Sequence, residues 1–294
     1  MLAAVLDRRQ VVAAGGLLAA SPSGQSGASL PPLATFGVQV YDDDAAERYT
    51  TQALEAGYRS FFTSPEAGNQ RGFARAVRAS GVPRQALYIA GSVLSDDAES
   101  ERAARQLTAT ACDESRSALS DGGVETLDLL LIERPAGSRA AVRGQWRALA
   151  SRREAGWARG LGTCNFGAAQ LDWLPERPLL NQSPFSLGVR MPHAAVLQQH
   201  RLRGVALQAW GPLGGPFGAF PAQMWQACAE VGAARRASRE QVALRWITQQ
   251  GVGCCVHSRS AAHLRQTLAA CSGSFDLTER ELVRLGELAA EPLV

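Results

Sequence analysis

Residues 127–151, "LDLLLIERPAGSRAAVRGQWRALAS", hold one complete strand–helix unit. The apolar run Leu127–Leu131 predicts a strand that is covered on both faces, because a half-exposed strand would alternate with polar residues. After a short turn, the apolar residues of Ala140–Ser151 recur at three- and four-residue spacing, which predicts an amphipathic helix. A strand buried on both faces and followed by a helix is typical of parallel α/β folds.

The same alternation recurs on both sides of this unit. Further strands are predicted at Leu87–Ala90, Gly204–Leu207 and Val252–Val256, and further helices at Ala45–Ala56, Gly72–Ala79 and Arg239–Gln249. About eight strand–helix units fit beyond Leu30, which is the number in a closed barrel. The GxGxxG fingerprint of an open dinucleotide-binding sheet does not occur. We therefore predict an α/β fold, a (β/α)8 TIM-type barrel that forms one domain over residues 30–294.

The composition places the chain among globular proteins, since 46% of its 294 residues are hydrophobic and 19% are charged. The net charge of +3 is small and no basic stripe with interleaved aromatic residues occurs, so no nucleic acid is expected as a partner. The sequence contains arginine but no lysine. Mechanisms that need a lysine amine, such as Schiff-base formation, are thereby excluded.

The cysteines do not indicate a metal site. None forms a CxxC pair or a Cys/His cluster, so no metal is expected. Cys254 and Cys255 are adjacent in a predicted strand and would point to opposite faces, which suits packing better than metal binding. The six cysteines are Cys112, Cys164, Cys228, Cys254, Cys255 and Cys271.

Residues 1–29 differ from the rest and are predicted to be a targeting segment. Arg8 and Arg9 precede the short apolar run Val11–Ala20, and small residues follow up to Ala28. This order is typical of an export signal, and paired arginines before a mild apolar run resemble twin-arginine signals. Export or a thylakoid lumen location is the expectation, and a cytoplasmic or stromal protein with an N-terminal extension is the alternative. The run is too short to span a membrane, so no integral membrane segment is expected.

Beyond Leu30, nearly the whole chain resembles the aldo-keto reductases, with the segments in the family's order. The segments that carry the resemblance are "EAGYRSFFTSPEAGNQRGFARAVRASGVPRQALYIAGSV" (55–93), "LDLLLIERP" (127–135), "RGLGTCNFGAAQLDWL" (159–174), "PLLNQSPFSL" (178–187), "GVALQAWGPLGG" (204–215) and "SREQVALRWITQQGVGCCVHSRSAAHLRQTL" (238–268). The resemblance implies a TIM-type barrel, in agreement with the periodicity. It also implies the NADPH-dependent reduction of aldehydes and ketones.

In this family an Asp, Tyr, Lys and His tetrad performs the reduction, with the tyrosine as proton donor. The resemblance places four other residues at these positions, in the same order: Phe62, Ala67, Ser92 and Glu133. Alanine has no proton to give, and phenylalanine cannot hold a cation. The usual carbonyl reduction is therefore not expected on these four residues.

Glu133 is the one candidate for a replacement acid. A carboxyl group beside Phe62 at a barrel mouth is expected to have a raised pKa and to stay protonated near neutral pH. A branch of the family that reduces steroid double bonds has a similar Glu, although it keeps its tyrosine. Arg134 could instead pair with Glu133 and hold it ionised, and Glu66 could be one more solvated acid of a polar rim.

The resemblance implies a site for NADP(H) that is better kept than the tetrad. Asn165 and Gln182 match the family residues that hold the nicotinamide carboxamide, and Cys164 replaces a serine beside them. Trp210 offers an aromatic face in place of a stacking tyrosine. The segment "GPLGGP" (211–216) follows it and keeps the small, backbone-exposing character suited to a pyrophosphate, with Gly211, Leu213 and Gly214 as the candidate binding positions. The alternative is that Asn165 and Gln182 satisfy buried backbone groups without any cofactor.

Recognition of the cofactor's 2′-phosphate is expected to be weaker and dependent on pH, because histidines replace a lysine and an arginine of the family. The matching positions are His257, Ser258, His263 and Thr267. The remaining histidines, His193 and His200, match no family function and are predicted to lie at the surface.

Two functions remain open. The first is an NADP(H)-linked oxidoreductase with a rebuilt site, acting on a small carbonyl or enone compound through Glu133 or through protonation assisted by the substrate. The second is a pseudoenzyme, a barrel retained as a nucleotide-binding, regulatory or protein-binding module. A new ionisable donor near Ala67 would favour the first, and the turn offers only Glu66 there.

Overall fold

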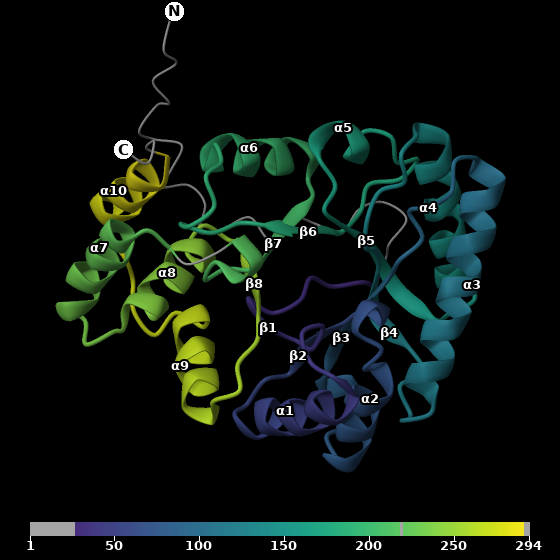
Figure 1. Cartoon of the computed structure of the whole chain (residues 1–294), viewed down its shortest axis with the longest axis horizontal. Helices are drawn as coiled ribbons and strands as arrows, with labels where there is room; N and C mark the ends of the chain where they lie inside the picture. Colours follow the sequence, from purple (N-terminus) through teal and green to yellow (C-terminus); the bar gives the residue numbers. More distant parts are fainter. Residues whose placement is uncertain (1–26, 218–219, 291–294) are drawn as a thin grey trace, which may run out of the picture.

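Eight parallel strands close into a barrel in the computed structural model, which describes residues 27–217 and 220–290 (Figure 1). Each strand pairs with its sequence neighbours, and β8 returns to β1. This confirms the predicted (β/α)8 barrel. The strands are β1 (Ala34–Gly37), β2 (Ser60–Thr63), β3 (Tyr88–Val93), β4 (Leu127–Ile132), β5 (Ala158–Cys164), β6 (Leu180–Pro184), β7 (Ala206–Trp210) and β8 (Gly253–Val256).

The helices form an outer layer around the strands, with α1 against α2 and α3 against α4 (Figure 1). Several begin at a Ser or Asp whose side chain accepts a backbone N–H of the first turn, as at Asp42 and Ser138. The helices are α1 (Asp43–Glu55), α2 (Gln70–Ala79), α3 (Glu101–Ser120), α4 (Arg139–Glu154), α5 (Ala168–Leu171), α6 (His193–Arg203), α7 (Ala222–Ala233), α8 (Arg239–Thr248), α9 (Ala261–Cys271) and α10 (Glu279–Ala290), with short 3-10 turns η2 (Pro65–Ala67), η3 (Arg84–Ala86) and η4 (Gly215–Phe217). None of these helices is long and apolar enough to cross a membrane.

The close approach of α3 and α4 depends on Gly144. A β-carbon at this position would lie 2.2 Å from the backbone oxygen of Glu101 and 3.0 Å from the β-carbon of Ala104. Because a side chain cannot fit there, the two helices pack backbone to backbone. This contact fixes the helical layer outside β4, the strand that leads into Glu133.

Alternate residues of each strand enter two separate apolar clusters. Phe62, Leu131 and Cys255 belong to the cluster inside the barrel, whereas Phe61 and Cys254 belong to the larger cluster between barrel and helices. This confirms that Cys254 and Cys255 point to opposite faces of β8. All six thiols are free and buried. The interior is therefore a packed core, and the residues that follow the strands form its polar end.

The amino end of the barrel is closed by the residues that precede β1. Ala28 is buried in the interior cluster, and the Tyr88 hydroxyl donates to the backbone oxygen of Ser29 at 2.9 Å. The rest of the predicted targeting segment, residues 1–26, lies outside the described residues. Its identity as a leader stays a prediction.

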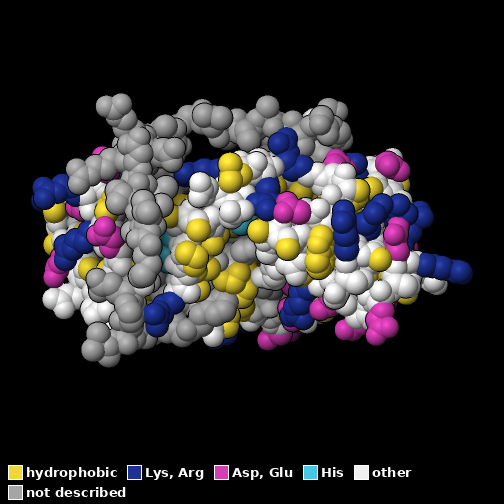
Figure 2. All heavy atoms as spheres, turned by 90° about the horizontal axis from the view of Figure 1, so that it is seen from above, with side chains coloured by type: hydrophobic (Ala, Val, Ile, Leu, Met, Phe, Trp, Pro, Cys, Tyr) yellow, Lys and Arg dark blue, Asp and Glu magenta, His cyan; other side chains and the backbone are white. Residues whose placement is uncertain are grey.

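Acidic and basic side chains are interspersed over the described part of the face seen in Figure 2. Many arginines pair with carboxylates of a neighbouring element, as Arg203 does with Asp172 at 2.7 Å and Arg75 with Glu47 at 2.7 Å. These partly exposed pairs add little to stability individually. They show, however, that many of the arginines are paired with carboxylates of the same protein.

Candidate active site

The carboxyl ends of β2, β3 and β4 bring Ser64, Ser92 and Glu133 together. The Ser64 hydroxyl donates to Glu133 Oε2 at 2.7 Å, and the Ser92 hydroxyl donates to the same oxygen at 2.6 Å. All three residues are buried. Parallel strands place these residues side by side at one end of the barrel, although they are far apart in sequence.

Glu133 is held at both its backbone groups as well. Its N–H donates to the Val93 oxygen at 3.0 Å, and its own oxygen accepts from Asn165 Nδ2 at 3.1 Å. Burial raises the pKa of the Glu133 carboxyl, and the hydrogen bonds from Ser92 and Ser64 offset part of that rise. Burial therefore acts in favour of the neutral carboxylic acid, and the two serine donors act in favour of the carboxylate.

Arg134 does not pair with Glu133, which corrects one of the two alternatives drawn from the sequence. Its guanidinium lies 2.8 Å from the carboxylate of Glu66, and both side chains are about half exposed, at 46% and 51%. The pair forms at the rim because both residues can keep their water there. Glu66 is thus the partner of Arg134, while Glu133 points into the protein.

Asn165 lies at the end of β5 in a left-handed conformation, with φ of 62°. Asparagine tolerates this region better than most residues. Its side-chain oxygen accepts from Trp210 Nε1 at 2.9 Å while its amide donates to Glu133. Asn165 therefore connects the ends of β4, β5 and β7.

A network of hydrogen bonds crosses the barrel interior beneath Asn165, and we call it the interior network. Cys164 Sγ donates to Gln182 Oε1 at 3.7 Å, and Gln182 Nε2 donates to Gln208 Oε1 at 2.7 Å. Gln208 Nε2 then donates to Thr35 Oγ1 at 3.0 Å, which lies 2.8 Å from Ser60 Oγ. Because the thiol and the amides donate in one direction, these bonds polarise one another and fix the orientation of the Gln182 amide.

The other positions of the predicted site are spread around the same end of the barrel. Phe62 is buried in the interior cluster, whereas Ala67 is half-buried in η2. Gly211 and Gly214 follow β7 with positive φ of 61° and 105°, and Leu213 between them is half-buried. The backbone after Trp210 therefore takes conformations that glycine permits most readily.

The residues matched to phosphate recognition lie beyond β8. His257 is exposed and its ring meets the Tyr41 ring edge-on, with centroids 6.3 Å apart. Partial desolvation and the nearby Arg259 lower the pKa of His257. Ser258 Oγ accepts from the Ser260 N–H at 3.1 Å, and the exposed His263 follows in the first turn of α9. Thr267 is half-buried about one helical turn after His263 in α9.

Residues 33–290 match the Aldo/keto reductase family. The chain belongs to the aldo/keto reductase family. A protein named "Aldo-keto reductase" from Mycobacterium sp. (strain MCS) is 32% identical over 274 residues, which cover 91% of this chain and 90% of the relative. The protein named "2,5-diketo-D-gluconic acid reductase B" from Corynebacterium sp. is 30% identical, with 75% of this chain and 76% of the relative covered.

Solved structures of aldo-keto reductases share the fold. The Bombyx mori aldo-keto reductase in complex with NADP superimposes with a TM-score of 0.76 at 22% identity, covering 87% of this chain and 89% of that structure. The eight-stranded barrel observed here is the fold of these family members. Among the described residues of this family member, no group of three or more His, Cys, Asp or Glu side chains is arranged to hold a metal ion.

His193 and His200 are buried in this aldo/keto reductase, at 7% and 8% exposure, so the prediction that they lie at the surface was wrong. His193 packs edge-on against Phe185 and Trp246. His200 Nδ1 lies 2.8 Å from the Val196 oxygen. Because a carbonyl oxygen only accepts, Nδ1 is the donor in this bond. Periodicity did not indicate this burial, because the buried face of α6 contains polar residues and the helix is weakly amphipathic.

Burial lowers the pKa of both His193 and His200, which gives a prediction for stability. A folded-state pKa below the unfolded value means that the unfolded chain takes up protons first as the pH falls. We therefore expect the free energy of unfolding to drop between about pH 7 and about pH 5. Urea unfolding of the His193→Phe variant should show a smaller drop than the unchanged protein. An equal drop in both proteins would contradict this origin.

Asn181 is a site residue that the sequence analysis missed in this family member. Its oxygen accepts from Thr163 Oγ1 at 2.9 Å and from the Phe166 N–H at 3.3 Å, so it holds the turn that carries Asn165. Its amide lies 3.1 Å from His200 Nε2. A buried strand that contains Asn and Gln, as "LLNQ" does at 179–182, was the available signal, since such amides need partners.

Ser64, Gln208 and Arg259 were also missed. Ser64 caps the short turn η2, and a serine directly before a proline at a strand end is a signal for such a cap. Gln208 stands in the otherwise apolar "VALQAW", 205–210. Arg259 is exposed next to the His257 position and brings a fixed positive charge to the loop after β8.

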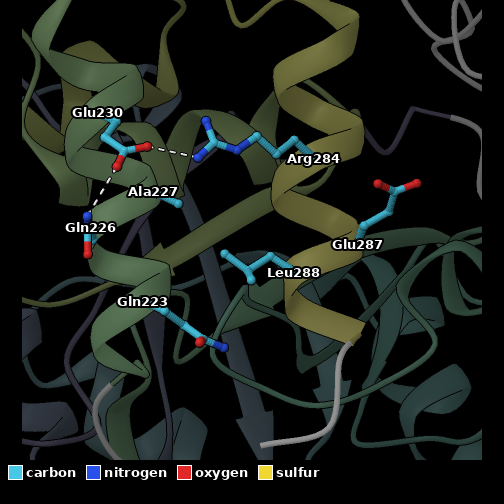
Figure 3. A pocket seen from close by; sticks show the side chains of 7 residues that line it. All are labelled: Gln223, Gln226, Ala227, Glu230, Arg284, Glu287 and Leu288. Carbon is cyan, nitrogen blue, oxygen red and sulfur yellow. Dashed lines mark hydrogen bonds and ion pairs between the residues drawn. The ribbon is translucent and has the colours of Figure 1, made fainter.

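A groove of about 370 Å³ lies outside the barrel, between α7 and α10 (Figure 3). An ion pair of Arg284 with Glu230 at 2.8 Å spans it, and Gln226 bonds the same carboxylate. The lining residues are Gln223, Gln226, Ala227, Glu230, Arg284, Glu287 and Leu288. None of the candidate site residues of this aldo/keto reductase lines the groove, so it does not belong to the site at the barrel mouth.

Proposed function

We propose that this protein is an NADP(H)-linked reductase of a small carbonyl or enone compound, and that Glu133 is its proton donor. The observation that carries the proposal is the buried Glu133 carboxyl, which accepts two serine hydroxyls and, within residues 27–217 and 220–290, forms no ion pair with an arginine. The family positions of the aspartate, tyrosine and lysine hold Phe62, Ala67 and Ser92. Glu133 is then the ionisable group left at the tetrad positions.

The chemistry requires one hydride and one proton. When bound, NADPH supplies the hydride to the electrophilic carbon of a polarised C=O or C=C bond. The neutral Glu133 carboxyl gives its proton to the oxygen or carbon that becomes negative, and the resulting carboxylate regains a proton from water. Ser64 and Ser92 stabilise that carboxylate through their hydroxyls.

The residues around the mouth fit a nicotinamide cofactor. Gln182 Nε2 carries two amide hydrogens, of which Gln208 accepts one, so a second can bond the cofactor carboxamide together with Asn165. Trp210 offers its ring for stacking, and Gly211 and Gly214 follow with positive φ suited to a pyrophosphate. The relative from Bombyx mori, whose structure contains NADP, supports this choice of cofactor.

The loop after β8 supports binding of the 2′-phosphate through His257, Ser258 and His263. Because the pKa of His257 is lowered, its ring contributes little charge near neutral pH. Arg259 supplies a positive charge in the same loop. The Corynebacterium relative, named for a diketo acid, supports a ketone among the substrates to be tested.

A second candidate function is a non-catalytic module that binds nucleotide or a protein partner. It is favoured by one observation, that Asn165 and Gln182 already bond protein groups with both their amide nitrogen and their oxygen. Such bonds would preserve both residues without turnover. The two functions agree on the fold and differ in whether Glu133 is required for reduction.

Calorimetric titration with NADPH and NADH tests the first requirement of the proposal, that the protein binds a nicotinamide nucleotide. We expect NADPH to bind. Gln182→Ala and Trp210→Ala should each weaken its binding by about tenfold or more, because the first removes a side-chain amide that hydrogen-bonds the cofactor and the second removes a stacked ring. Trp225→Phe is the matched control, because the Trp225 ring in α7 stacks on Phe220, just before that helix, and is not among the residues proposed to hold the nucleotide. It should bind as the unchanged protein does.

Absence of binding for both nucleotides at millimolar concentration would overturn the reductase proposal. Equal binding by the Gln182 and Trp210 variants would move the nucleotide to another site. Binding that depends on both residues justifies a screen of ketone, aldehyde and enone substrates.

A further inference from the structure

Both serine hydroxyls at the barrel mouth bond one oxygen of Glu133, and this selects the oxygen that carries its proton. We propose that Ser64 and Ser92 are positioning residues that hold Glu133 Oε2 as the carbonyl oxygen and so place the transferable proton on Oε1. The inference deepens the proposed function and rests on it for the reaction, but the position of the proton is a property of the free protein.

A neutral carboxyl group has one O–H donor and one carbonyl oxygen. Oε2 accepts from Ser64 at 2.7 Å and from Ser92 at 2.6 Å, so both of its lone pairs are used. A proton on Oε2 would displace one of these bonds and leave a buried hydroxyl without its acceptor, which costs about 1–3 kcal/mol. The same proton on Oε1 displaces neither.

Neither serine is free to turn away. Ser64 Oγ accepts from the Glu66 N–H at 3.2 Å as the cap of η2, so its single hydrogen is left for Glu133. Ser92 is fully buried in β3, opposite Leu131 of β4. The Glu133 backbone is fixed by Val93 on one side and by Asn165 on the other. The acid is therefore oriented before any substrate binds.

Three charged or titratable groups act on the Glu133 carboxyl besides the serines, namely Glu66, Arg134 and Cys164. Arg134, from the same loop, is engaged by Glu66 at 2.8 Å, which makes that rim pair neutral as a whole. Cys164, from β5, is buried, and burial raises the pKa of its thiol well above the usual range, so it is neutral too. The hydroxyls of Ser64 and Ser92 also hydrogen-bond the ionised form and so lower the pKa of Glu133. Removing either hydroxyl should therefore raise that pKa further.

Infrared difference spectroscopy of the nucleotide-free protein tests the position of the proton. The carbonyl stretch of a protonated carboxyl moves to lower wavenumber with each hydrogen bond to the carbonyl oxygen. We expect Ser64→Ala and Ser92→Ala each to move the Glu133 band to higher wavenumber, and the double variant to move it further. Ser92→Thr, which keeps a hydroxyl, should restore the position. Glu133→Gln identifies the band by removing it.

Ser95→Ala is the matched control, since Ser95 is equally buried but bonds Thr108 at 2.8 Å and not Glu133. It should leave the band in place. A band that stays in place in the double variant, or no protonated carboxyl band that depends on Glu133 near neutral pH, would overturn the inference.

The reaction gives a second readout. The alkaline limb of the pH profile of kcat should move to higher pH by about one unit in each alanine variant, the effect of one lost hydrogen bond to a charge. A fall in kcat with an unmoved limb would mean that the serines act only on structure. If the infrared shifts occur while Glu133→Gln still reduces substrate, the proton is placed correctly and the proposed function is wrong.

Discussion

Replacing Glu133 by glutamine should lower kcat for NADPH-dependent reduction by about 10²–10⁴-fold, the usual contribution of a positioned acid. Glutamine has nearly the same shape and can accept the Ser64 and Ser92 hydroxyls at its oxygen, but it has no acidic proton. Nucleotide affinity should stay unchanged, because the cofactor residues are not altered. Steady-state kinetics together with calorimetry separates the two effects.

The pH profile sharpens this test. The unchanged protein should lose activity as the pH rises through the raised pKa of Glu133, because the reaction needs the neutral acid. This limb should be absent from the residual activity of the Glu133→Gln variant. Glu66→Gln is the control, since Glu66 is exposed and paired with Arg134, and it should keep kcat within about twofold. Equal losses in both variants would mean that Glu133 is not the donor.

Replacing Asp128 by alanine should lower the free energy of unfolding by about 1.5–3 kcal/mol, because it removes a buried carboxylate that two arginines and a backbone N–H share. The Asp128 carboxylate, 7% exposed, accepts from Arg84 at 2.8 Å, from Arg159 at 2.6 Å and from the Ile89 N–H at 2.8 Å. These contacts join the starts of β3, β4 and β5. Urea unfolding measures the change in the free energy of unfolding.

The stability of Asp128→Asn should lie between that of the unchanged protein and that of Asp128→Ala, because the asparagine oxygen can still accept from the Ile89 N–H while the charge is lost. The exposed pair Arg71–Asp121, with side chains 62% and 60% exposed, provides the comparison. Asp121→Ala should cost less than about 1 kcal/mol. If Asp128→Ala costs no more than Asp121→Ala, the buried cluster does not stabilise the amino end of the barrel.

Much of the fold could be predicted from hydrophobic periodicity. The run Leu127–Leu131 lies within the strand Leu127–Ile132, and the helix expected at Ala140–Ser151 extends over Arg139–Glu154. Boundaries differ by a few residues because caps such as Ser138 decide where a helix begins. Periodicity could not place His193 and His200, since α6 is weakly amphipathic and its buried face contains polar residues.

Individual residues of the candidate site could be predicted from the sequence, but their contacts with one another could not. The family resemblance pointed to Glu133, Asn165 and Gln182, but nothing local to Glu133 shows that Ser64 and Ser92 bond it, because the three lie on different strands. Likewise, adjacency in sequence suggested that Arg134 could neutralise Glu133. At the end of a strand, successive side chains point in opposite directions, and the arginine pairs across the rim instead.

The interior network has a consequence for the order in which the barrel assembles. Its bond from Gln208 to Thr35 joins residues separated by 173 positions. Such a bond needs β7 and β1 to be brought together in the barrel. Bringing them together costs the conformational entropy of closing the long loop between them. We therefore expect this bond to form late in folding. Weakening it should leave the folding rate nearly unchanged and speed unfolding, so these buried amides govern how long a closed barrel persists.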